Sequence, residues 1–106
     1  MKNRRQNPRL TIMGMVRVRL PGDSKAVEAY LANISRGGIG IYLHKKTRVG
    51  EKLRIAVPSK DKDDQEEEFG AEVAWISRAG ELYMVGVRFE SMTKDKYHAV
   101  LTSLFS

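Results

Sequence analysis

The stretch Asn33-Ile34-Ser35-Arg36-Gly37-Gly38, followed by the strand-like run Ile39 to Leu43, sets the organisation of the whole chain. Small polar residues beside paired glycines are typical of a tight turn between two strands. The glycines tolerate positive φ and allow close approach to the backbone. Asn33 offers an amide, Ser35 offers a hydroxyl that suits a phosphate oxygen, and successive N–H groups can form an anion-binding concavity. The stretch therefore predicts either an ordinary strand-to-strand turn or an anion-binding loop.

Alternating apolar residues on both sides of this stretch predict a series of short β-strands. The expected strands are residues 10–20, 25–32, 39–43, 52–57, 69–77 and 82–89. In the first of them, the buried face is expected to carry Leu10, Ile12, Val16, Val18 and Leu20. The acidic stretch from Ser59 to Glu68 is expected to form a long exposed hairpin loop with no role in ligand binding.

The hydrophobic period changes near the C-terminus, where apolar residues fall at helical spacings. These residues are Tyr97, Val100, Leu101, Leu104 and Phe105. They predict an amphipathic helix over residues 94–105, with Thr93 as its N-cap. Strands followed by one helix predict a mainly β protein, a small six-stranded antiparallel barrel whose C-terminal α-helix covers an opening or a face.

A length of 106 residues suits one domain, which we expect over residues 10–106 after an N-terminal arm of residues 1–9. The arm is polar and basic, and we expect it to be mobile in the free protein. The net charge of +6 favours an anionic partner such as a nucleotide, a nucleic acid or an acidic membrane surface. Because residues 1–20 contain no acid while residues 60–68 are mostly acidic, the charge does not form a uniform coat for DNA.

Catalytic and metal-binding chemistry has little support in the sequence. The chain contains no cysteine, and its two histidines, His44 and His98, lack metal-ligand spacing. No nucleophile–base set, Walker loop or Rossmann fingerprint is present, so we expect neither an enzyme nor a metal site. No apolar run approaches the roughly 18 residues of a membrane span, and no secretory signal is visible, so we expect a cytoplasmic protein without membrane contact.

Two motifs together point to a known family. An arm with the pattern Arg5-x-x-x-Arg9 precedes two strands, which are followed by Asn33-x-Ser35-x-x-Gly38. This order and separation resemble the PilZ domain family, whose pattern accepts Asp or Asn at the first loop position. The resemblance covers essentially the whole chain. It implies a small β-barrel that serves as a receptor for the bacterial second messenger cyclic di-GMP, without a further cofactor.

The resemblance also implies roles for individual residues in binding cyclic di-GMP. Arg5 and Arg9 would clamp the ligand from the arm, since arginine makes bidentate bonds to phosphate, stacks on flat rings and matches the O6 and N7 acceptors of guanine. Asn33 and Ser35 would meet the ligand from the barrel, and Gly38 would allow close approach.

Four further residues are candidates for the same site. The resemblance implies that the position of Arg4 helps to set the number of bound ligands, and an arginine there can stack on a second guanine, so we expect a stacked pair of ligands. Arg36 and Gly37 belong to the turn and are further candidate contacts. Trp75 either supplies an aromatic surface beside the site or packs in the core.

The expected mechanism is a change in the arm, which folds across the barrel mouth when ligand bridges it to the loop. The new surface would be read by a protein target in motility, pilus or polysaccharide machinery. One alternative is a β-barrel that binds nucleic acid, although the strands do not show the several exposed aromatic residues that stacking requires. The other is a PilZ-like adaptor that binds only protein, although such domains usually carry damaged motifs.

Overall fold

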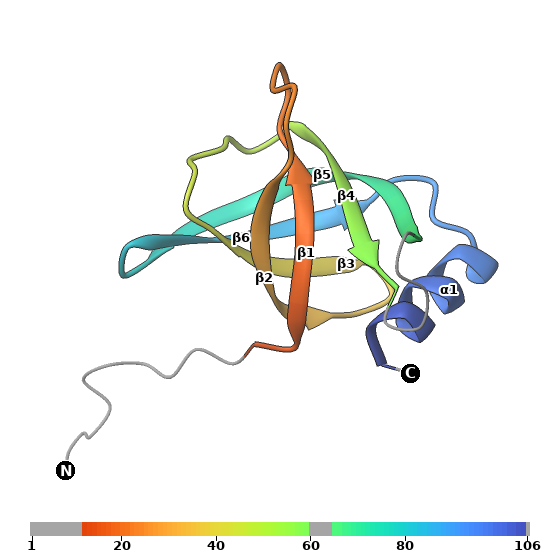
Figure 1. Ribbon diagram of the computed structural model, residues 1–106. Coiled ribbons are helices and arrows are strands. Elements are labelled where there is room, and N and C mark those ends of the chain that lie inside the picture. The colour runs from red at the N-terminus through yellow and green to blue at the C-terminus, as the bar shows by residue number, and fades with distance from the viewer. Residues whose placement is uncertain (1–11, 60–64, 106) are drawn as a thin grey trace, which may run out of the picture.

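The structure, a computed structural model, describes residues 12–59 and 65–105. Within these ranges, six antiparallel strands close into a barrel and one helix follows them (Figure 1). The elements are β1 (Gly14–Arg19), β2 (Val27–Ile34), β3 (Gly38–Leu43), β4 (Lys52–Pro58), β5 (Glu66–Ala79), β6 (Leu82–Phe89) and α1 (Lys94–Phe105). Around the barrel the order is β1-β2-β3-β6-β5-β4, and β4 pairs with β1 to close it. The predicted mainly β barrel with a C-terminal helix is confirmed.

Apolar side chains on the inward face of each strand fill the barrel. Leu53, Ile55 and Val57 of β4 are fully buried, as their alternation with polar residues predicted. The predicted first strand begins later than expected, at Gly14, and Ile12 precedes it with 47% of its surface exposed. The prediction that Ile12 belongs to the buried face is therefore wrong. Ile12 precedes the paired strand, and strand pairing is what fixes which side chains point inward. Leu10 lies outside the described residues.

The acidic stretch was assigned wrongly to a loop. Strand β5 begins at Glu66, so three consecutive acids continue the strand and pair with Ala56, Val57 and Pro58 of β4. Each of these acids contacts a cation on β1, β4 or α1, which offsets part of the repulsion among them. The ion pairs are Glu66–Arg17, Glu67–Lys96 and Glu68–Arg54. Residues 60–64 lie outside the described residues.

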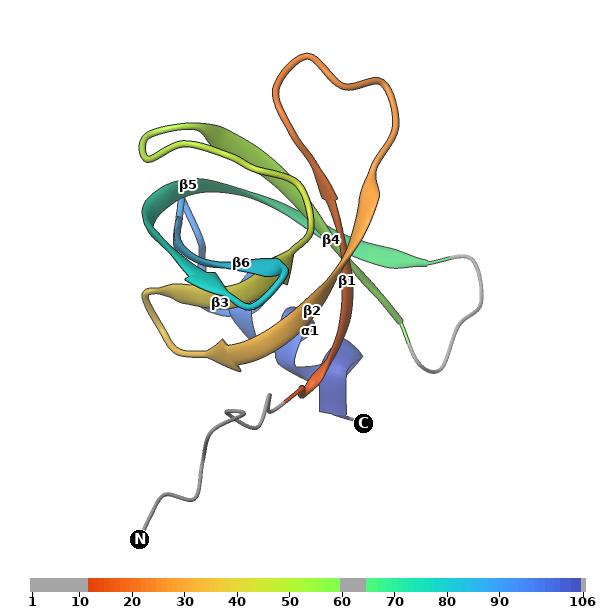
Figure 2. The same cartoon turned by 90° about the vertical axis from the view of Figure 1, so that its left-hand side faces the viewer.

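Helix α1 contacts β4 and β5 at the end of the barrel where β1 begins and β2 ends (Figures 1 and 2). Val100 and Leu104 reach the core and are almost completely buried. Phe105 was expected on the same apolar face, but it is 53% exposed, because the helix reaches the core through the side that carries Val100 and Leu104. The predicted N-cap is confirmed, since the backbone N–H of Lys96 donates to Oγ1 of Thr93 at 3.1 Å.

Replacing Thr93 with alanine is expected to lower the free energy of unfolding by about 1 kcal/mol, because the cap hydroxyl satisfies a backbone N–H of the first turn. Urea denaturation followed by circular dichroism measures the loss. Thr93→Ser is the matched control, because it keeps the hydroxyl and should retain most of the stability. Equal stabilities of the alanine and serine variants would contradict a capping role.

Candidate ligand-binding site

A β-bulge in β2 turns Asn33 toward the outside of the barrel. Leu31 pairs with Ile41 and Asn33 pairs with Gly40, so Ala32 is an extra residue in the ladder. In a regular strand, residues 31 and 33 would face the same side. Here Leu31 is fully buried, whereas Asn33 is exposed. The bulge therefore places the Asn33 amide on the outer surface, within β2, which extends past the predicted end at residue 32.

A second bulge in β5 does the same for Trp75. Val73 pairs with Val87 and Trp75 pairs with Gly86, which leaves Ala74 as the extra residue. Val73 is fully buried, but Trp75 is 47% exposed. The alternative that Trp75 packs in the core is therefore wrong. The tryptophan forms part of the outer surface.

The two bulged strands, β2 and β5, lie at the two ends of a row of residues that pair across four strands. Asn33, Gly40, Gly86 and Trp75 follow one another across β2, β3, β6 and β5. A Cβ atom on Gly40 would lie 2.9 Å from Nδ2 of Asn33, and one on Gly86 would lie 2.2 Å from the Trp75 ring. The glycines thus form a floor over which the amide and the indole ring lie.

A cavity of about 310 Å³ opens over this floor, and we call it the glycine trough. Besides the four residues of the row, it is lined by Ser35, Gly37, Gly38, Ile39, Ala74, Val87 and Arg88. The trough therefore brings together the predicted loop residues Asn33, Ser35 and Gly38 with the further candidates Gly37 and Trp75. It combines an aromatic face, an amide and a hydroxyl on one outer surface of the sheet.

The turn between β2 and β3 differs from the predicted geometry. Neither Gly37 nor Gly38 has a positive φ. Gly38 is required for another reason, since a Cβ atom there would lie 1.9 Å from the carbonyl oxygen of Val87 on β6. The N–H of Ser35 donates to the carbonyl of Gly38 at 2.9 Å, so this N–H is used within the turn. The Ser35 hydroxyl also donates to this oxygen, at 3.4 Å, and this longer, weaker hydrogen bond can be exchanged for one to a ligand.

Arg88 is a residue of the trough that sequence analysis missed. It pairs with Gly38 across β3 and β6, and its side chain is exposed. Its Nη2 atom lies 3.9 Å from a carboxylate oxygen of Glu72, a distance at which a solvated ion pair is weak. In the sequence, Val85 and Val87 alternate with outward-facing residues, and this pattern indicates only that Arg88 faces solvent. Its place beside the turn depends on strand pairing, which that alternation does not specify.

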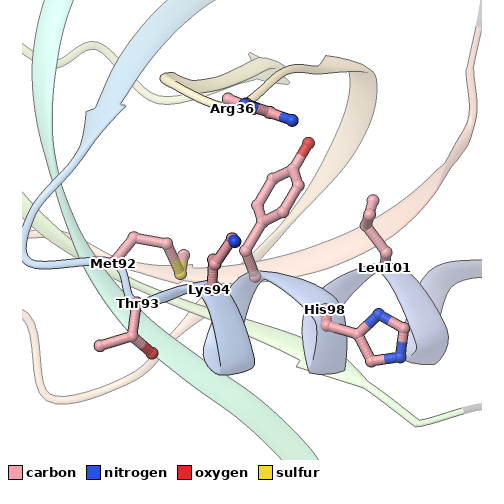
Figure 3. Close-up of a pocket in the computed structure, with 7 residues that line it drawn as sticks. Arg36, Met92, Thr93, Lys94, His98 and Leu101 are labelled. Carbon is pink, nitrogen blue, oxygen red and sulfur yellow. The ribbon is translucent and has the colours of Figure 1, made fainter.

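Arg36 points away from the trough, although it belongs to the same turn. It lines a separate cavity against α1, together with residues of the helix such as Lys94 and His98 (Figure 3). The structure therefore does not bring this candidate contact together with Asn33 and Ser35. The predicted arm residues Arg4, Arg5 and Arg9 lie outside the described residues.

The loop between β3 and β4, at the other end of β3 from the turn, has its own fixed structure. The buried Thr47 hydroxyl and the Arg48 N–H both donate to the carboxylate of Glu51, which lowers the pKa of Glu51. On the adjoining outer surface, a hydrogen bond to Glu90 raises the pKa of Lys52. Lys52 also lies 3.9 Å from the carboxylate oxygen of Glu72 that contacts Arg88, so these charges continue to the edge of the trough.

The described residues thus form a small closed β-barrel domain with an outer trough that has a glycine floor and walls of tryptophan, asparagine and arginine. Comparison with protein families matches residues 3–106 to the PilZ domain, a match that includes both the arm motif and the loop motif. The chain therefore belongs to the PilZ domain family, whose members bind cyclic di-GMP or act as adaptors and are not catalytic. A search of curated proteins found no match. No helix in residues 12–59 and 65–105 is long and apolar enough to cross a membrane.

Proposed function

We propose that the chain is a cytoplasmic receptor for cyclic di-GMP, which it binds between its N-terminal arm and the glycine trough. The observation that supports this most is the convergence of Asn33, Ser35 and Trp75 on one outer cavity. The indole ring offers a stacking face for guanine, and stacking of a base on an aromatic residue is typically worth about 1–3 kcal/mol. The Asn33 amide can pair with a guanine edge, and Ser35 and Arg88 can bind phosphate oxygens.

The beginning of the described chain lies close to the trough. The N–H of Met13 donates to the carbonyl of Leu31 at 2.7 Å, two residues before Asn33 on β2. Arg9 precedes Ile12 by three residues, which an extended chain covers in about 10 Å. Arg5 is four residues further along the chain, an extended span of about 13 Å. Both motif arginines are therefore within reach of a dinucleotide in the trough.

Ligand binding would then fix the arm against the barrel. Ordering the arm opposes binding, whereas charge-assisted hydrogen bonds to phosphate and stacking on guanine favour it. The surface formed by arm, ligand and barrel is what a protein partner in motility, pilus or polysaccharide machinery would read. An adaptor that binds only protein is the alternative function within the family.

Calorimetric titration with cyclic di-GMP tests this proposal, with cyclic di-AMP and GTP as matched ligands. We expect saturable binding of cyclic di-GMP and much weaker binding of cyclic di-AMP, because adenine presents an amino donor where guanine presents the O6 acceptor. Equal affinities for the two cyclic dinucleotides would refute guanine recognition. Absence of binding would support the adaptor, and tighter, salt-sensitive binding of single-stranded RNA would support a nucleic-acid function.

The number of bound ligands tests the role of Arg4. A stacked pair brings doubled phosphate charge into one site, and the additional guanidinium of Arg4 would offset this repulsion. We predict two ligands per chain for the native sequence and a ratio shifted toward one in Arg4→Leu, measured by calorimetry at saturation. Arg4→Lys is the control that keeps the charge. A ratio of one for the native chain would exclude the stacked pair and leave the receptor proposal intact.

A further inference from the structure

A second cavity, which we call the helix cavity, lies between the β2–β3 turn and α1 (Figure 3). Its volume of about 470 Å³ exceeds that of the glycine trough and falls in the usual range of small-molecule sites. Arg36 reaches it from the turn. Lys94, His98 and Leu101 border it from the helix.

The charge around the helix cavity is one-sided. Arg36 and Lys94 both line it, neither forms an ion pair with any described residue, and none of the described acids lines it. The first turn of α1 adds the positive end of the helix dipole. Lys96 gives a useful contrast, because it belongs to the same helix but is paired with Glu67 at 3.1 Å. The cations of the cavity therefore remain available to an anion.

The remaining wall of the helix cavity is apolar and held in place by the core. Met92, Tyr97 and Leu101 supply most of this wall. The Tyr97 ring packs edge-on against Phe89 at 6.0 Å, and Phe89 packs in the same way against the buried Phe69 at 5.3 Å. A wall fixed in this way can bind an apolar group without first becoming ordered.

We propose that the helix cavity is a second ligand site, for an organic anion with an apolar body, such as an aliphatic or aromatic carboxylate or sulfonate. The anionic group would lie between Arg36 and Lys94, and the apolar body would contact Tyr97 and Leu101. This site is separate from the trough and does not depend on the binding of cyclic di-GMP.

The test uses the full chain and the fluorescent probe 1-anilinonaphthalene-8-sulfonate, an aromatic anion. Its uncharged analogue N-phenyl-1-naphthylamine is the matched ligand, because it has the same ring system without the sulfonate. We expect Arg36→Gln to weaken binding of the sulfonate about tenfold and Lys94→Gln about threefold, with little effect of either change on the analogue. Lys46→Gln, an exposed cation in the β3–β4 loop, is the matched control and should change neither affinity.

Leu101→Ser should weaken binding of both probes, because the apolar body is common to them. Amide chemical shifts of the native chain locate the probe without any substitution, and we expect the shifts that change to be those of α1 and the Arg36 turn. The proposal is overturned if Arg36→Gln binds the sulfonate as tightly as the native chain does. It is also overturned if the perturbed amides lie elsewhere, or if the analogue loses as much affinity as the sulfonate.

Discussion

Replacing Arg5 and Arg9 together with alanine is expected to weaken binding of cyclic di-GMP by about a hundredfold to ten-thousandfold. Each guanidinium can make charge-assisted hydrogen bonds worth about 1.5–3 kcal/mol, and two such losses add when the residues act on separate groups of the ligand. Because both residues precede the barrel strands, the unfolding transition should not change. Calorimetry measures the affinity, and thermal denaturation checks the fold.

The matched control for this pair removes two cations that do not line the trough. Lys46 and Arg48 are exposed in the loop between β3 and β4, so the double alanine variant should bind cyclic di-GMP almost as the native chain does. Arg5→Lys separates charge from geometry, because lysine keeps the charge but loses the planar fork. If the lysine variant binds as well as the native chain, simple attraction between charges is enough and bidentate recognition is wrong.

Gly38→Ala is expected to destabilise the barrel by about 3 kcal/mol. The added methyl group would lie 1.9 Å from the carbonyl oxygen of Val87 and 2.9 Å from its carbon, and both atoms belong to the backbone of β6. No side-chain rotation relieves such a contact, so β3 and β6 must separate locally. Urea denaturation followed by circular dichroism measures the change in the free energy of unfolding.

Gly37→Ala is the matched control, one residue earlier in the same turn. A Cβ atom on Gly37 meets nothing within 4 Å, and its φ is not positive, so this change should alter stability by no more than about 0.5 kcal/mol. Equal stability of the two alanine variants would show that the close approach of Gly38 to β6 does not constrain the fold. The loop-motif glycine would then need an explanation in ligand binding alone.

The barrel could be predicted from the sequence because its elements depend on local patterns. Alternation of buried and exposed residues located the strands, and the Thr93 cap and helical spacing located α1. The start of β5 was missed because three consecutive acids resemble a solvated loop. Here their backbone pairs with β4, and their side chains contact Arg17, Lys96 and Arg54, which come from distant parts of the chain.

The sequence predicted the loop-motif residues of the site, named Trp75 as a candidate with two possible places, and missed Arg88. Asn33, Ser35 and Gly38 are neighbours in sequence, and the structure places them on one trough. Trp75 and Arg88 join them through two bulges and the pairing of β5 with β6 and of β6 with β3. A bulge shifts the outward direction of every later side chain, and nothing in the local hydrophobic pattern marked the extra residues Ala32 and Ala74. The sequence therefore left Trp75 undecided between the core and the site, and the bulge in β5 places it on the outer surface.

The central claim is that cyclic di-GMP binds in the glycine trough, and fluorescence of the native chain tests it most directly. Trp75 is the only tryptophan in the sequence, and its exposed ring forms one wall of the trough. A guanine stacked on this ring should change its emission. Titration with cyclic di-GMP is therefore predicted to change the fluorescence in proportion to the heat measured by calorimetry. Both signals should reach saturation at the same ligand concentration. Calorimetric binding without any change in Trp75 emission would contradict the account, because the ligand would then bind elsewhere on the protein.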